Sequence, residues 1–253
     1  MSKSRIPATG EGYLGEIMVH RLSRAVGVVE RSERSEEMIA SNLDGLKRVL
    51  CIGAHSDDIE IGCGGTVLRL IEQNPNLEFY WLVLCSNTQR AIEATKSANE
   101  FLKGVKKKTI VVKDFRDGFL PYIGAPVKEA FEEIKRTFVP DLVFTHTRQD
   151  LHQDHRMTCE LTWNTFRSHM ILEYEIPKYD ADLKPTNYFV PLSDKQAKKK
   201  VKGLMRFFGT QKNKHWFSED LFEGLMRLRA IEVASPTRYA EGFHCRKILM
   251  GDV

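Results

Sequence analysis

The chain has 253 residues, of which 42% are hydrophobic and 28% charged, and a formal net charge of +4 at pH 7. This length suffices to bury a large core, and the composition is that of an ordinary globular protein. The small positive charge favours an anionic substrate or a local phosphate site. It argues against a nucleic-acid-binding protein, which would show clustered basic residues beside a reading motif.

The cysteines and the apolar runs bear on where the protein works. Five cysteines are scattered without a C-x-x-C pair, which favours reduced thiols over a disulfide framework. The sequence has no run of 18 apolar residues and no apolar segment behind its basic N-terminal residues, so neither a membrane-spanning helix nor a signal peptide is expected. The sequence therefore predicts a cytoplasmic protein.

Strands and helices are expected to alternate from residue 48 onwards. Residues 1–47 form a lead-in, with one or two helices between about residues 16 and 46. Strands follow from short apolar runs and helices from the amphipathic stretches between them. The first four expected strands are 49–52, 79–85, 109–112 and 142–145. The expected helices are 64–73, 90–102, 127–138 and 156–166, with a loop over 114–124.

The alternation weakens after residue 169. We expect strands over 171–176, 187–190 and 245–250, and helices over 193–208 and 219–232. Residues 48–169 thus predict a Rossmann-like α/β core, a doubly wound and mostly parallel sheet with helices on both faces. Residues 170–253 predict an α+β extension that packs on the same sheet and forms one wall of the pocket, all within a single domain.

Two groups of polar residues follow the first and the fourth expected strands. His55, Asp57 and Asp58 come after the first strand, and His152 and His155 come after the fourth. In a doubly wound sheet, ligands bind at the carboxyl ends of strands where the strand order reverses, and these two strands normally flank that crevice. We therefore expect the two groups to meet in space.

These residue types suit a zinc site. Catalytic zinc typically takes three protein ligands and keeps one position for water, and the expected ligands are His55, Asp58 and His155. Iron(II) also accepts nitrogen and oxygen ligands. Asp57 is then free to accept a proton from the water, whose pKa zinc lowers towards about 7. His152 is expected to stabilise an oxyanion or to protonate a leaving amine.

Simpler interpretations of the same residues exist. Asp58 precedes an expected helix and would serve as an N-cap, although the paired histidines at the opposing strand end favour the metal site. The glycines Gly62, Gly64 and Gly65 do not fit G-x-G-x-x-G after the strand. They predict a tight turn and close packing of a helix against the sheet.

The motifs together resemble the PIG-L or LmbE-like family of zinc-dependent N-acetylglucosaminyl deacetylases. The resemblance rests on H-S-D-D at 55–58, E-I-G-C-G-G-T at 60–66 and H-Q-D-H at 152–155, and it extends to 90–98, 140–143 and 238–243. Ala54 and Ser56 stand where the family often has proline, and Ile59 replaces a frequent glutamate. These departures touch no expected ligand but weaken inference about the substrate.

The resemblance implies zinc on His55, Asp58 and His155, with Asp57 as the base and His152 as the oxyanion or acid partner. It also implies removal of an acetyl group from an N-acetylated amino sugar, either a small molecule or a glycoconjugate. The alternatives are a zinc hydrolase of a non-sugar amide and a non-catalytic member that binds a glycan. No nucleic-acid partner is expected, and a homo-oligomer is left open.

Further residues have weaker signals. Arg90 is expected either to bind a substrate oxygen or anion, or to form a surface ion pair on its own helix. Asp117 is expected to cap Gly118, with a bond to a sugar hydroxyl as the alternative. His146 is expected to support the site or to pack in the core, and Glu241 to support the pocket. The lysine run at 195–202 is expected to form a solvated helix face.

Overall fold

The computed structural model describes residue 43 and residues 45–249 of the chain. The expected N-terminal helices between residues 16 and 46 therefore lie almost entirely outside the described residues. The division of the chain into lead-in, core and extension stays a prediction. Among the described helices, none has the length and apolar character needed to cross a membrane.

The described strands form one seven-stranded sheet. They are β1 (Arg48–Gly53), β2 (Glu78–Cys85), β3 (Lys107–Phe115), β4 (Leu142–His146), β5 (Met170–Tyr174), β6 (Tyr188–Leu192) and β7 (Tyr239–Cys245). Their order is β3-β2-β1-β4-β5-β7-β6. Strands β1 to β5 pair in parallel, whereas β7 is antiparallel to both β5 and β6. The expected mostly parallel α/β fold with a mixed C-terminal part is confirmed.

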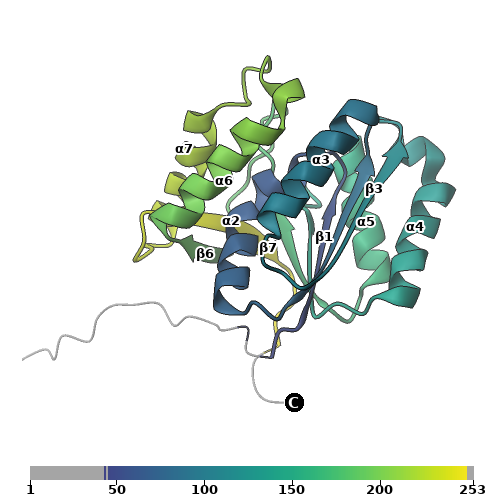
Figure 1. Cartoon of the computed structure of the whole chain (residues 1–253), viewed down its shortest axis with the longest axis horizontal. Helices are drawn as coiled ribbons and strands as arrows, with labels where there is room; N and C mark the ends of the chain where they lie inside the picture. Colours follow the sequence, from purple (N-terminus) through teal and green to yellow (C-terminus); the bar gives the residue numbers. More distant parts are fainter. Residues whose placement is uncertain (1–42, 44, 250–253) are drawn as a thin grey trace, which may run out of the picture. The chain divides into compact units, whose positions relative to one another are not determined.

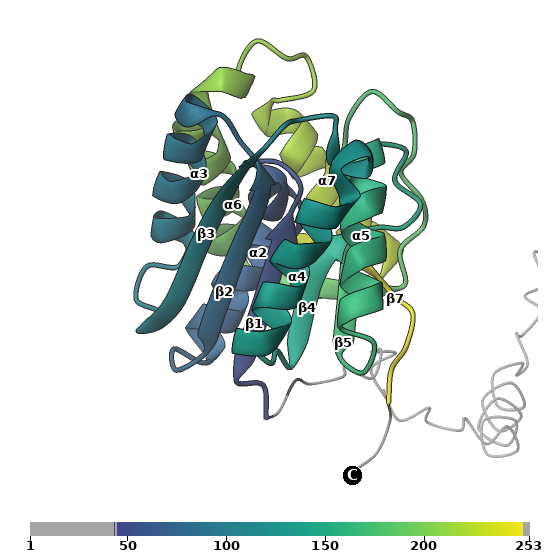
Figure 2. The same cartoon turned by 90° about the vertical axis from the view of Figure 1, so that its right-hand side faces the viewer.

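Six α-helices cover this sheet within the described residues. They are α2 (Asp58–Gln73), α3 (Thr88–Phe101), α4 (Gly124–Thr137), α5 (Gln153–Thr165), α6 (Asp194–Phe207) and α7 (Glu219–Glu232). Two short 3-10 helices, η1 (Leu120–Ile123) and η2 (Gly209–Gln211), lie in the connections. Helices α4 and α5 lie on one face of the sheet, and α2, α3 and α6 lie on the other (Figure 1, Figure 2).

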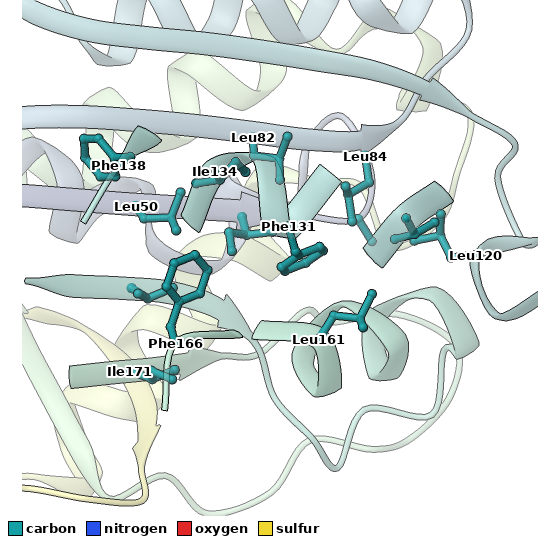
Figure 3. Close-up of a cluster of buried hydrophobic side chains, with 14 of the residues drawn as sticks. Leu50, Leu82, Leu84, Leu120, Phe131, Ile134, Phe138, Leu161, Phe166 and Ile171 are labelled. Carbon is teal, nitrogen blue, oxygen red and sulfur yellow. The ribbon is translucent and has the colours of Figure 1, made fainter. Parts of the chain in front are cut away.

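Strand β1 contributes to the core between the sheet and helices α4 and α5. Leu50 of β1 packs there with Leu82, Phe131 and Phe166 (Figure 3). Ile52 of β1 belongs to the same cluster. Every residue of β1 after Arg48 is buried. Because β1 is buried on both faces between β2 and β4, the residues that follow its carboxyl end have a fixed starting point.

Helix α2 begins at Asp58, six residues before its expected start at residue 64. Gly62, Gly64 and Gly65 therefore lie inside a helix, and the expected tight turn is wrong. The expected close packing is confirmed, because a Cβ built on Gly62 would overlap the ring of Tyr174. A Cβ on Gly65 would likewise overlap Leu192. Glycine is a weak helix former, but here the tertiary packing outweighs that preference.

The last strand is also displaced from its expected place. It spans Tyr239–Cys245, so the expected strand over 245–250 is wrong. Glu241 and Gly242 disfavour a strand by propensity, yet Glu241 is buried and accepts hydrogen bonds from the backbone N–H groups of Gly65 and Thr66. The ammonium of Lys200 lies 2.6 Å from the same carboxylate. Lys200 is thus buried, whereas the other lysines of the run are exposed as expected.

Candidate metal centre and active site

The polar segments that follow β1 and β4 meet at the carboxyl edge of the sheet, because these two strands are hydrogen-bonded neighbours. Nδ1 of His55 lies 3.0 Å from Nε2 of His155 and 3.4 Å from Oδ2 of Asp58. The third separation, from Oδ2 of Asp58 to Nε2 of His155, is 3.6 Å. Ligand atoms around a tetrahedral zinc ion lie about 3.4 Å apart. The three expected ligands therefore fit a metal ion in number, type and spacing.

Asp58 is held by its own turn. Its Oδ2 accepts a hydrogen bond of 2.6 Å from the backbone N–H of His55, and Asp58 is the first residue of α2 rather than its N-cap. The N-cap is Asp57, whose side chain makes no capping hydrogen bond. The interpretation of Asp58 as a helix cap is therefore wrong, and its carboxylate points to the two histidines.

Two carboxylates fix the orientation of the histidine rings. Oδ2 of Asp150 lies 2.8 Å from Nδ1 of His155, and Oδ2 of Asp154 lies 3.1 Å from Nε2 of His55. A carboxylate on one ring nitrogen holds the proton there and leaves the other nitrogen free for a metal. The free nitrogens are the two that lie 3.0 Å apart.

The sequence analysis did not assign these two carboxylates. Both stand in D-L-H-Q-D-H at 150–155, and the general pairing of metal-binding histidines with carboxylates was a signal for them. Burial raises the pKa of Asp150, but the hydrogen bond and charge of His155, with further charges nearby, outweigh it and lower that pKa below its usual value. Asp150 is therefore an ionised acceptor.

Asp57 has one engaged oxygen and one free oxygen. Its Oδ1 accepts a hydrogen bond of 2.7 Å from Nη2 of Arg90, whereas Oδ2 is buried and has no partner among the described residues. Burial raises the pKa of Asp57, and the charge of Arg90 opposes that shift. A buried carboxylate oxygen without a partner is costly, so this atom marks a place where a water molecule or a substrate is accommodated.

Arg90 also reaches Asp117, with 3.5 Å between Nη1 and Oδ2. The surface ion pair expected within its own helix is therefore wrong, and a contact of Arg90 with substrate stays a prediction. Asp117 lies 3.1 Å from Nε2 of His55, so it contacts the site instead of capping Gly118. Sequence reasoning missed this contact because residues 116–119 carry no regular pattern.

His152 is the N-cap residue of α5 and is partly buried. Its ring centroid lies 4.6 Å from that of His155 and 4.9 Å from that of His55. Burial, together with the charge of His55, lowers the pKa of His152, which favours the neutral ring. Nδ1 accepts the backbone N–H of Asp154, so the neutral ring carries its proton on Nε2 and can donate it.

The same position leaves a second role for His152. One nitrogen each of His55, His152 and His155 lies within 4.8 Å of the others, which is compatible with an additional ligand. The catalytic role of His152 therefore stays a prediction.

His146 supports the site, which was one of the two roles expected for it. Its buried ring stacks on His155 with 3.9 Å between centroids, and its Nε2 lies 3.1 Å from Oδ2 of Asp58. Nε2 also accepts the backbone N–H of Ala54 at 3.0 Å, which engages this nitrogen within the protein. Among the described residues, Glu241 binds α2 and Lys200 and forms no hydrogen bond or ion pair with the three expected ligands, so its support of the pocket stays a prediction.

Comparisons with known proteins find similarity to deacetylases. Residues 50–166 match the family described as PIG-L: GlcNAc-PI de-N-acetylase. The chain is 29% identical over 234 residues to diacetylchitobiose deacetylase of Thermococcus kodakarensis, a match that covers 78% of this chain and 82% of that protein. It is 27% identical over 149 residues to the uncharacterized deacetylase YaiS of Escherichia coli K12, covering 56% and 80% respectively.

A solved structure shows the same fold. It is N,N'-diacetylchitobiose deacetylase from Pyrococcus horikoshii complexed with its inhibitor MPG, with a TM-score of 0.59, 22% identity and 94% of each chain covered. The segment matched by the family, 50–166, contains all three expected ligands as well as Asp57, Arg90 and His152.

Proposed function

Because the chain belongs to the PIG-L family of deacetylases, hydrolases of amide bonds, we propose that it removes the acetyl group from an N-acetylated amino sugar, free or within a glycoconjugate. The observation that carries the proposal is the free oxygen of Asp57 beside three ligand atoms spaced 3.0, 3.4 and 3.6 Å apart. The site thus joins a metal-binding triad to an oriented base.

His55, Asp58 and His155 are the residues that hold the metal in this proposal. Zinc bound there supplies Lewis acidity, which lowers the pKa of a water molecule towards about 7 and polarises a carbonyl group. Nitrogen and oxygen ligands also accept iron(II). All three residues are buried, and such a setting would strengthen the electrostatic effect of a metal that they hold.

Asp57 transfers the proton, and His152 stabilises the charge on the carbonyl oxygen. Oδ2 of Asp57 accepts a proton from the water molecule as the oxygen of that water forms a bond to the acetyl carbon. Nε2–H of His152 donates a hydrogen bond to the carbonyl oxygen as negative charge develops there. The carbon–nitrogen bond then breaks, Asp57 passes the proton that it accepted to the nitrogen, and acetate and a free amine leave.

Arg90 prepares the base for this step. Its hydrogen bond of 2.7 Å holds Oδ1 of Asp57 and so fixes the direction of Oδ2. An oriented base saves the entropy of aligning the reacting groups. The family description names GlcNAc-PI and the Thermococcus relative is named for diacetylchitobiose, and both names support an amino sugar as the substrate class.

The test is acetate release by the zinc-loaded protein from a panel of substrates. The panel contains N-acetylglucosamine, diacetylchitobiose, nucleotide-linked and lipid-linked N-acetylglucosamine, and N-acetyl amino acids as matched amides without a sugar. We expect release from at least one sugar and none from the amino acids. Release from the amino acids alone would replace the sugar with another amide. Sugar binding without release by the zinc-replete protein would indicate a non-catalytic member.

A further inference from the structure

The segment between β5 and β6 carries a buried ion pair beside the metal centre. Lys178 has a side chain only 9% exposed, and its Nζ lies 2.5 Å from Oδ2 of Asp182 and 3.0 Å from Oδ2 of Asp150. Asp180 lies 3.8 Å from the same ammonium. The three carboxylates therefore surround a lysine, and this acidic cluster already contains its own cation.

The pair Lys178 and Asp182, here called the clamp, contacts Asp150 and Leu151 of the turn at 150–152, and Asp150 in turn contacts His152. Lys178 contacts the side chain of Asp150, and Oδ2 of Asp182 accepts the backbone N–H of Leu151 at 2.8 Å. Oδ1 of Asp150 accepts the backbone N–H of His152 at 2.8 Å. The clamp thus fixes the turn from which α5 starts.

This turn places two histidines of the site. His152 is its last residue, and His155 follows in the first turn of α5. His155 is further tied to the clamp through Asp150. Oδ2 of Asp150 lies 2.8 Å from Nδ1 of His155 and 3.0 Å from the ammonium of Lys178. A carboxylate held by several donors at once cannot turn away from the ring that it orients.

The backbone between the clamp residues is strained. Ala181 has a φ of 53°, in the left-handed region that residues with a Cβ rarely adopt. Strain of this kind persists only where the surrounding contacts over-determine the conformation, and it gathers at functional sites. Here the contacts of Lys178 and Asp182 on either side of Ala181 hold it.

We propose that the clamp of Lys178 and Asp182 is a positioning device for the metal centre, which sets the ring of His155 through Asp150 and the place of His152 through the turn at 150–152. The proposal rests on the proposed metal-dependent function. The clamp touches no ligand directly, so its residues are positioning residues. It makes metal affinity depend on a segment that follows β5 and lies outside the two sequence motifs.

A single substitution would change both the charge near the metal site and the positioning of the ligands, so its effect on zinc affinity would have two causes. Removing the ammonium of Lys178 alone takes a positive charge away from a cation site and by itself strengthens zinc binding. The decisive variant is therefore the double substitution Lys178→Met with Asp182→Asn, which removes one positive and one negative charge. The local net charge is unchanged, so any loss of affinity reports lost positioning.

The matched control is Lys128→Met with Glu132→Gln. These residues of α4 also form an i, i+4 ion pair, and the double substitution changes the charges in the same way. We expect this control to bind zinc within about twofold of the wild-type affinity, since partly exposed pairs contribute little and the contacts of Lys128 are with Glu132 and Thr165, not with the turn at 150–152.

The experiment titrates zinc against a chromophoric chelator and records the visible spectrum of the cobalt(II)-loaded protein. For the clamp variant we expect zinc affinity to fall about tenfold, the lower end for partners of metal-binding histidines, and the cobalt spectrum to change. If that variant does not fold, Lys178→Gln with Asp182→Asn keeps polar groups at both positions, and we expect its zinc affinity still to fall below that of the wild type.

Wild-type affinity and an unchanged cobalt spectrum in a folded clamp variant would overturn the proposal. Neither readout needs a substrate, so the clamp is tested even if no sugar is deacetylated. A wild-type protein that binds no zinc would instead remove the metal-dependent function on which the proposal rests.

Discussion

Arg90 and Asp57 are joined by a hydrogen bond of 2.7 Å from Nη2 to Oδ1, which leaves Oδ2 of Asp57 buried and without a partner among the described residues. Arg90 lies in the first turn of α3, after β2, whereas Asp57 follows β1. Because β1 and β2 are parallel neighbours, both residues lie at the same edge of the sheet. The arginine engages one oxygen of the expected base and leaves the other for the reaction.

Replacing Arg90 with Met should therefore disturb the base and leave the metal ligands in place. We expect kcat to fall by on the order of 10²-fold, as misplaced catalytic groups do, with zinc content unchanged. Arg90→Lys keeps the charge without the forked geometry and should retain more activity than Arg90→Met. Steady-state kinetics with metal analysis is the measurement, and equal kcat in all three proteins would contradict this role.

Replacing Asp150 with Asn should weaken zinc binding. The amide loses the charge that holds Nδ1–H of His155 at 2.8 Å, so zinc affinity should fall about 10- to 100-fold. The control is Asp141→Asn, whose carboxylate accepts two backbone N–H groups, from Lys47 and Arg48. It should lower stability while zinc affinity stays the same. Similar affinities for both variants in chelator competition would show that Asp150 does not orient the ligand.

Gly62→Ala should destabilise the protein, because its methyl group would overlap the buried ring of Tyr174. That ring is fixed by a hydrogen bond of 2.6 Å from its hydroxyl to the carbonyl oxygen of Ile52. We expect the free energy of unfolding to fall by about 1–3 kcal/mol, the usual cost of overpacking. Urea denaturation measures it.

The matched control is Gly224→Ala in α7, where a Cβ meets nothing within 4 Å. The same substitution there should raise the free energy of unfolding by about 0.5–1 kcal/mol, since alanine favours a helix over glycine. Equal shifts for the two variants would mean that α2 is not packed against Tyr174 as described.

The meeting of the two motifs was predictable from the sequence, and the support around them was not. Apolar runs at 49–52 and 142–145 identified β1 and β4, and the topology of doubly wound sheets then placed His55 beside His155. Which carboxylate meets which ring nitrogen depends on ring rotation and on loop paths, which no local pattern encodes. The sequence analysis therefore gave Asp150 and Asp154 no role.

The burial of two charged residues was also not predicted from the sequence. Lys200 was expected on a solvated helix face and Glu241 near the pocket, yet they form a buried pair 2.6 Å apart that joins α6 to β7. Sequence rules place lysine and glutamate on the surface because an unpaired buried charge is costly. The partner of Lys200 lies 41 residues away in the sequence, so no local pattern announces the pair.

The cytoplasmic location stays a prediction.

The most direct test of the account compares the wild type with Asp57→Asn, measuring acetate release from the best sugar of the panel and zinc content in the same samples. The amide keeps the size of the side chain but cannot accept the proton of the water. We predict a fall in kcat of about 10²- to 10⁴-fold, the usual contribution of a general base, with zinc still bound. Acetate release at the wild-type rate by zinc-loaded Asp57→Asn would contradict the role of Asp57 as the base.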